Sequence, residues 1–203
     1  MIHLYCATGN AGKLREFRLA ADLSRIQIDL VPNFKQLPEA IEDGGTFEEN
    51  AIKKALHYSP HAEGLLFADD SGLEVEALGG APGVYSARYS GPGATDESNN
   101  RLLLERLEGV SNRKARFVCA IALVDGLRVV GVCHGAAEGE ILHEPRGANG
   151  FGYDPLFYCP AFGCTFAEAT GEQKFSLSHR GQAFRAMLAS LQDWPPGPSV
   201  QRS

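Results

Sequence analysis

Residues 2–23 read IHLYCATGNAGKLREFRLAADL, an apolar run, a turn with two glycines and an amphipathic run. The apolar run Ile2–Ala7 is typical of a buried strand, and Leu14–Leu23 is typical of a helix. In the turn between them, Thr8–Lys13, the glycines let backbone N–H groups approach an anion, the asparagine can cap the helix and the lysine adds a positive charge. The stretch therefore predicts a strand that enters a helix through a phosphate-sized turn.

This turn differs from the common phosphate loop GxxxxGK[ST]. Ala7 stands where that pattern has its first glycine, and Leu14 stands where it has the hydroxyl residue that holds magnesium. If a nucleotide binds here, we expect its metal ion to be held by other residues.

Length and composition bound the domain organisation. The chain has 203 residues, of which 44% are hydrophobic, enough for one globular domain or two lobes that share a sheet. We expect that domain to span residues 1–194, with residues 195–203 a frayed tail. The sequence has no apolar run of about 18 residues and no basic, apolar leader at its start, so we expect a cytoplasmic protein without a membrane partner.

Charge and cysteine usage exclude further classes. The net charge of -6 disfavours a nucleic-acid-binding surface, which needs clustered lysine and arginine, but it is compatible with a small anion in a local basic pocket. The five cysteines are odd in number and form no CxxC pair, which disfavours a disulfide framework and a structural zinc site.

Apolar and amphipathic runs alternate along the rest of the chain, a pattern typical of an α/β protein. Asp125-Gly126 between two β-rich runs is a hairpin signal, so part of the sheet should be antiparallel. Further strands are predicted at 26–31, 65–68, 73–77, 115–124, 127–133 and 156–158, and further helices at 46–58, 95–107 and 178–193.

An acidic segment follows the predicted strand 65–68. Asp69 and Asp70 precede Ser71-Gly72, and adjacent residues at a strand end point to opposite sides, so we expect only one carboxylate to face a ligand. Such a carboxylate can hold magnesium and accept a proton from an attacking water. The alternative is a solvated turn whose polar groups satisfy the local backbone.

A glycine-rich segment at 147–155 carries Phe151 and Tyr153. Three glycines leave these rings poorly covered, which favours a flat partner such as a nucleobase. The alternative is a tight loop whose rings tuck into the core.

A basic segment leads into the last predicted helix, with Lys174, His179 and Arg180. Cations at a helix start oppose the helix dipole, so we expect an anion or an electron-rich carbonyl to offset them. The alternative is an ordinary basic surface. A fourth segment, Gly80–Arg88, contains Pro82-Gly83 and Tyr85, and we expect a structural or subunit-contact role for it.

Six spaced motifs occur together, in an order that resembles the inosine/xanthosine triphosphate pyrophosphatase family. The resemblance covers about residues 4–188 and rests on the motifs TxNxxK from Thr8, TFxEN from Thr46, ADDSGL from Ala68, GxPGxYSAR from Gly80, FGYDP from Phe151 and SHRG from Ser178.

The resemblance implies an elongated two-lobed α/β fold around a long mixed β-sheet, with helices on both sides and the active-site cleft between the lobes. It implies hydrolysis of dITP, ITP and XTP to monophosphate and pyrophosphate with Mg²⁺, by a homodimer. Asp70 matches the family's proton acceptor and metal-linked carboxylate, and Glu42, or alternatively Glu39, matches its additional metal-linked glutamate.

The remaining implied roles concern substrate contacts. The triphosphate is expected along Thr8, Gly9, Asn10, Ala11, Gly12 and Lys13, with Ser71 in contact with substrate; the base and sugar against Phe151, Gly152, Tyr153 and Asp154; and further contacts from Lys174, His179 and Arg180. Two alternatives stay open: a pyrophosphatase of the septum-inhibitor type, and a nucleotide-sensing module without catalysis.

Overall fold

The computed structural model describes residues 2–22 and 26–191. The strands are β1 (Ile2–Cys6), β2 (Ile26–Leu30), β3 (Leu65–Val75), β4 (Lys114–Asp125), β5 (Arg128–Ile141), β6 (Phe157–Cys159) and β7 (Cys164–Thr165). The α-helices are α1 (Ala11–Asp22), α2 (Phe47–Tyr58), α3 (Asp96–Arg106), α4 (Gly171–Leu177) and α5 (His179–Leu191), and a 3₁₀ helix, η4, spans Gly83–Arg88.

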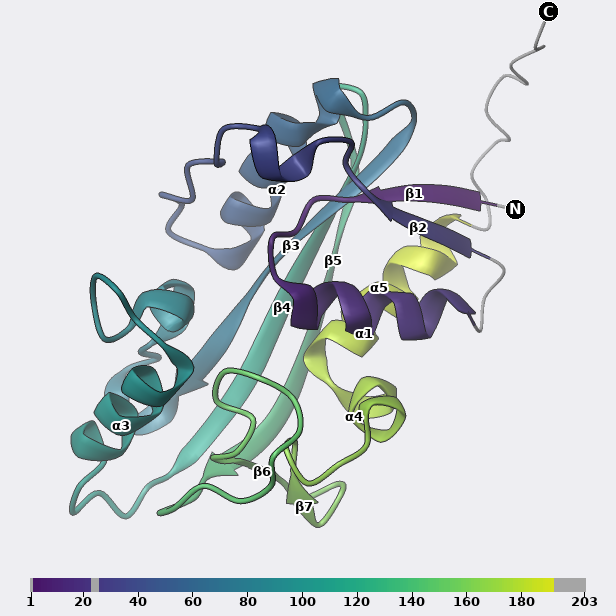
Figure 1. The fold of residues 1–203 in the computed structure, drawn as a ribbon. Coiled ribbons are helices and arrows are strands. Elements are labelled where there is room, and N and C mark those ends of the chain that lie inside the picture. Colours follow the sequence, from purple (N-terminus) through teal and green to yellow (C-terminus); the bar gives the residue numbers. More distant parts are fainter. Residues whose placement is uncertain (1, 23–25, 192–203) are drawn as a thin grey trace, which may run out of the picture.

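One seven-stranded mixed sheet runs through the described residues, in the order β2-β1-β3-β4-β5-β6-β7. β1 is parallel to β2 and β3, and the other neighbouring pairs are antiparallel. β3, β4 and β5 form the long axis of an elongated molecule (Figure 1). The predicted α/β fold with a mixed sheet is confirmed, as is the hairpin at Asp125-Gly126, where Gly126 has a φ of 55°.

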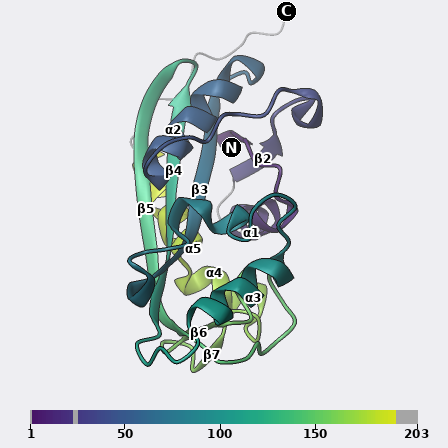
Figure 2. The same ribbon diagram turned by 90° about the vertical axis from the view of Figure 1, so that its left-hand side faces the viewer.

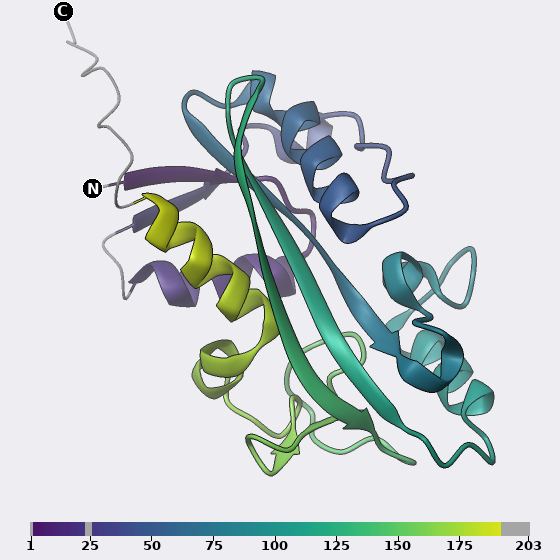
Figure 3. The ribbon, with the colours of Figure 1, turned by 180° about the vertical axis from the view of Figure 1, so that it is seen from behind.

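Helices cover both sides of this sheet. α1 and α5 bury Phe17, Phe67 and Phe184 on one side, and Figure 3 shows α5 lying along β4 and β5. α2 covers the opposite side over Leu66 and Ala120. Figure 2 shows α3 near the end of the sheet where β6 and β7 lie, away from β2. The helices thus divide between the sheet faces and its far end.

β3 differs from the prediction. It is one strand of 11 residues, whereas two short strands were predicted on either side of a turn at Asp69–Gly72. Its antiparallel partner β4 pairs with every residue from Leu65 to Val75, so the ladder continues through the polar residues. The predicted turn is therefore wrong, because tertiary pairing overrides the low strand propensity of Asp, Ser and Gly.

Threonine side chains cap two helices that start close to their predicted positions. Thr46 and Thr95 cap α2 and α3 by accepting hydrogen bonds from the backbone N–H groups of Glu49 and Ser98. The side chain of Glu49 accepts a hydrogen bond of 2.7 Å from Gly45 N. Helix α1 starts three residues before the predicted start, because Asn10 accepts hydrogen bonds from Lys13 N and Leu14 N.

Helix α4 was not predicted. A capping box between Thr170 and Gln173 starts it, and the extended residue Ser178 separates it from α5. The predicted ends of the first and last helices at Leu23 and Asp193, and the frayed tail 195–203, lie outside the described residues.

No helix in the described ranges is long and apolar enough to cross a membrane.

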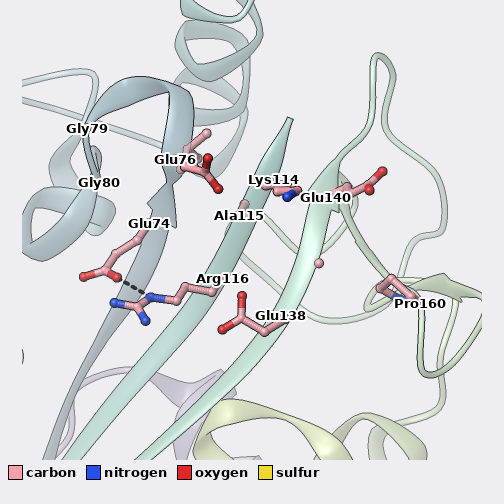
Figure 4. A pocket seen from close by; sticks show the side chains of 12 residues that line it. Glu74, Glu76, Gly79, Gly80, Lys114, Ala115, Arg116, Glu138, Glu140 and Pro160 are labelled. Carbon is pink, nitrogen blue, oxygen red and sulfur yellow. Dashed lines mark hydrogen bonds and ion pairs between the residues drawn. The ribbon is translucent and has the colours of Figure 1, made fainter. Parts of the chain in front are cut away.

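Below α2, one side of the sheet is left open as a hollow of about 680 Å³. Figure 4 shows it lined by charged side chains from three strands, among them Glu74 and Arg116, which form an ion pair with an N–O distance of 2.7 Å.

We predict that Gly135→Ala destabilises the fold, because a Cβ on this β5 residue would overlap the His179 carbonyl oxygen and lie 2.7 Å from Ala183 N in α5. The free energy of unfolding in urea should fall by about 1–3 kcal/mol, as for other overpacked sites. Gly131→Ala in the same strand is the control, since a Cβ there meets nothing within 4 Å. Equal losses in both variants would contradict the close helix–strand approach.

Candidate active site

The candidate site lies along the edge of β3 opposite β4, in the part where no strand of the described residues pairs with it. β1 pairs with β3 only at Leu66 and Phe67, whereas β4 pairs along its whole length. Near the C-terminal end of β3, an isolated β-bridge joins Glu74 to Pro82. Between these two points a pocket of about 310 Å³ opens at the strand edge, so side chains from both sides of the sheet reach it.

This pocket brings the predicted site residues together. Most of them line it: Thr8, Gly9, Asn10, Lys13, Glu42, Asp70, Ser71, Phe151, Gly152, Tyr153, Asp154, Lys174, His179 and Arg180. Ala11, Gly12 and the alternative Glu39 do not. The larger hollow of Figure 4 contains none of the predicted residues.

Gly12 packs directly against Phe151. A Cβ on Gly12 would lie 2.6 Å from the Phe151 ring, so the missing side chain makes room for that ring. Next to it, Lys13 Nζ lies 2.9 Å from Asp69 Oδ2, so the predicted positive charge of the turn already has a partner.

Asp69 and Asp70 point to opposite sides of β3, as strand alternation predicts. Asp70 lines the pocket, and its Oδ2 accepts a hydrogen bond of 3.0 Å from Asn50 Nδ2 in α2. Burial raises the pKa of Asp70 and outweighs the opposing effect of Lys13 and Lys54. The pKa of Asp69 shifts the other way: burial would raise it, but Lys13, Arg180 and Lys54 hold it well below its usual range.

Arg180 is almost fully buried, with 2% of its surface exposed. Its guanidinium donates to Asp69 Oδ2 at 3.4 Å, to Glu16 Oε2 at 2.5 Å and to Ser71 Oγ at 2.7 Å. These bonds engage three of its five N–H donors. The predicted anions that offset this cation at the start of α5 therefore include two carboxylates of the protein itself, those of Glu16 and Asp69.

Lys174 continues the same ionic chain. Its Nζ lies 2.7 Å from Glu16 Oε1 and 2.5 Å from Asp154 Oδ2. Asp154 Oδ2 also accepts a hydrogen bond of 2.9 Å from Phe151 N. Lys13, Arg180 and Lys174 are thus matched by Asp69, Glu16 and Asp154, and we call these six residues the buried ion chain.

The two aromatic side chains of the FGYDP segment separate. Tyr153 is 4% exposed and its hydroxyl donates to Ser86 O at 2.8 Å, so the core alternative is correct for this ring. Phe151 is half-buried in the pocket wall, with its ring centroid 4.8 Å from Lys174 Nζ and 5.5 Å from Arg180 Cζ. Both distances are in the range of cation–π contacts.

His179 lies buried beside these residues. Its ring stacks on Phe117 with a centroid distance of 4.7 Å and an interplanar angle of 10°. Burial, reinforced by Arg180 and Lys174, lowers its pKa well below the usual range, so the imidazole is neutral and not the cation that the prediction assumed. Its Nδ1 has no hydrogen-bond partner within the described ranges.

Sequence reasoning missed several residues at the site. Lys54 lines the pocket, and its Nζ lies 2.6 Å from Glu42 Oε1 and donates to Asp69 O at 2.9 Å. It follows Asn50 by four residues in α2, so the helical period from the TFxEN motif could have indicated it. Glu16 gave no comparable signal, because its partners lie more than 150 residues away.

The comparisons with known proteins agree on one family. The model of the Ham1 family matches residues 4–190. The chain is 46% identical to a dITP/XTP pyrophosphatase of Exiguobacterium sp., covering 93% of this chain and 96% of that protein. It is 48% identical to a dITP/XTP pyrophosphatase of Escherichia coli O157:H7, covering 92% and 96%.

Solved structures agree. A HAM1 protein from Coxiella burnetii superposes with a TM-score of 0.84 at 42% identity, covering 95% of this chain and 100% of that one. The Staphylococcus aureus Ham1 protein gives a TM-score of 0.82 at 38% identity, covering 94% and 98%.

We predict that Glu16→Ala destabilises the protein by about 3–5 kcal/mol, because it leaves two buried cations without their shared carboxylate. The loss should appear as a lower urea midpoint. Arg15→Ala is the control, since Arg15 is exposed on the same helix. If Glu16→Ala and Arg15→Ala unfold at the same urea concentration, Glu16 does not hold the chain of charges together.

Proposed function

The chain belongs to the Ham1 family, and on that premise we propose that it hydrolyses the deaminated purine nucleoside triphosphates dITP, ITP and XTP to monophosphate and pyrophosphate. One observation carries the proposal. Four residues of the turn (Thr8, Gly9, Asn10 and Lys13) line one pocket at the free edge of β3 together with Asp70 and Phe151.

The triphosphate would lie along Thr8–Lys13, at the start of α1. Backbone N–H groups at a helix start favour anions. Lys13 and Lys54 both line the pocket, and each is already bonded to Asp69, Lys13 through the carboxylate and Lys54 through the carbonyl oxygen. Because these cations are fixed before any ligand arrives, they need little reorganisation when negative charge enters the pocket.

The residues present fit a magnesium ion shared with substrate. No group of three metal-ligating side chains occurs in the ranges that the structure describes. Asp70 and Glu42 nevertheless line the same pocket, and the charge of Glu42 helps to raise the pKa of Asp70. Mg²⁺ is commonly held by one or two carboxylates together with phosphate oxygens and water, so Asp70 and Glu42 would hold it here. When bound, it would neutralise phosphate charge.

Asp70 is the proposed proton acceptor. Water would add to the α-phosphorus, the bond from that phosphorus to the bridging oxygen would break, and pyrophosphate would leave while Asp70 takes the proton of the water. A carboxylate with a raised pKa is a better base for this step than an ordinary aspartate. Asn50 donates to one oxygen of Asp70 and so orients the carboxylate.

Arg180 and His179 would select the base. Inosine and xanthine carry an acceptor at position 6, whereas adenine carries a donor. Two guanidinium N–H groups and the neutral imidazole remain for that edge once the internal bonds are counted. With ATP, donors would face a donor and stay unpaired, which can lower the rate by several orders of magnitude.

We also propose a cytoplasmic homodimer that binds no nucleic acid. The net charge of -6 supports the last point. Tyr85 in η4 is 59% exposed and lies under the Arg88 guanidinium, at 5.3 Å from Cζ to the ring centroid. Since interfaces enrich tyrosine and arginine, this segment is the proposed subunit contact.

Pyrophosphate release tests the proposed activity. The purified protein is incubated with Mg²⁺ and ITP, dITP, XTP, GTP or ATP, with a chelator in parallel. We expect ITP, dITP and XTP to be cleaved far faster than ATP, and no cleavage with chelator. Oxygen-labelled water should place its label in the monophosphate. Equal cleavage of ATP and ITP, or label in pyrophosphate, would refute the proposal.

Asp70→Asn should retain folding and most nucleotide binding but lose about 100- to 10,000-fold in kcat, the range typical of a removed general base. Asp125→Asn, in the exposed β4–β5 turn, should keep wild-type kcat. Both are measured with ITP under saturating Mg²⁺, with circular dichroism as the folding check. Wild-type turnover in Asp70→Asn would remove Asp70 from the mechanism.

A further inference from the structure

The segment Asn149–Asp154 crosses the pocket and is fastened on two sides. On one side it is tied to the chain around α4: Asn149 N donates to Ala167 O at 3.0 Å, and Asn149 Nδ2 donates to Ala169 O at 3.2 Å. At its other end Asp154 is paired with Lys174 of α4. Phe151 therefore lies in a segment that is bonded on one side to α4 and the residues before it, and on the other side to α3.

The bonds on the other side come from α3. Asp96 Oδ2 accepts a hydrogen bond of 2.7 Å from Gly152 N, and Asn100 Nδ2 donates one of 2.9 Å to Gly152 O. Asp96 and Asn100 are four residues apart, so they lie on one face of the helix. Gly152 has a φ of 62°, a backbone conformation that favours glycine. The backbone N–H and C=O of Gly152 are thus both hydrogen-bonded to side chains of α3.

We propose that Asp96 and Asn100 are positioning residues. Their two hydrogen bonds to Gly152, which we call the clip, hold the Phe151 ring over Lys174 and Arg180 and thereby set the affinity for the nucleobase. The proposal rests on the proposed function of the pocket. Phe151 directly precedes Gly152, so loss of the Gly152 hydrogen bonds leaves the Phe151 backbone held only on its Asp154 side and lets the ring move more. An ordered ring binds a flat base at a lower cost in conformational entropy than a mobile one.

Two observations favour this role over that of a general staple. Asn100 Oδ1 is buried without a hydrogen-bond partner in the described part of the chain, which costs desolvation free energy. The Nδ2 group of the same amide donates to Gly152 O, so the side chain is kept buried at this cost while it holds Gly152. Asn100 does not line the pocket, whereas Asp96 does. An effect of Asn100 on the substrate must therefore pass through Gly152, while Asp96 alone would leave a direct contact open.

The test compares Asn100→Ala, Asp96→Ala and Asp96→Asn. We expect KM for ITP to rise about 3- to 10-fold in each alanine variant, the effect of one hydrogen bond, with kcat within twofold, since loss of uniform binding raises KM alone. Asp96→Asn keeps an acceptor for Gly152 N and should restore a KM near that of wild type. Arg101→Ala is the control, an exposed residue of the same helix whose ion pair is with Glu105.

Hydrogen exchange supplies a readout that does not depend on activity. Amides of residues 147–155 should exchange faster in both alanine variants than in wild type and Arg101→Ala, at equal melting temperatures. Unchanged exchange, or faster exchange with unchanged KM in Asn100→Ala, would overturn the proposal. Failure of the wild type to cleave ITP would instead refute the proposed function, while the exchange data still test the clip.

Discussion

The site depends on Asp69 and its ion pairs with two cations. Asp69 is 1% exposed and lies between Lys13 in the first turn of α1 and Arg180 of α5, so it joins the two ends of the chain on one side of the sheet. Removing either cation would leave this buried carboxylate with one charged partner instead of two, which is destabilising. The buried ion chain extends this contact through Glu16 and Lys174 to the FGYDP segment. A continuous series of ion pairs thus joins the turn Thr8–Lys13 to the FGYDP segment.

This arrangement gives neighbouring residues different tasks. Asp69 is ionised and structural, whereas Asp70 faces the pocket with a raised pKa. Environments that push the pKa values of two carboxylates apart are a common basis for assigning acid and base roles. The division requires that β3 stay extended through both residues and that its edge stay uncovered, which β1 allows by pairing only as far as Phe67.

Local signals made much of this predictable. Three features depend on neighbouring residues, and the structure confirms them: the first strand with its turn, the helices predicted at 46–58 and 95–107, and the Asp125-Gly126 hairpin. The continuity of β3 was missed because it comes from pairing with β4. The identity of the charge partners was also missed. An anion was expected beside Arg180, but Glu16, which pairs with both Lys174 and Arg180, could not be named because it is distant from them in sequence.

The most direct test is a crystal structure with Mg²⁺ and a non-hydrolysable ITP analogue. We expect the triphosphate along Thr8–Lys13, the metal on Asp70 and the hypoxanthine against Phe151, with its 6-keto oxygen toward Arg180. The ion pairs of Arg180 with Asp69 and Glu16 should remain intact. A nucleotide bound in the hollow between β3 and β5, or an Arg180 released from both carboxylates, would contradict this expectation.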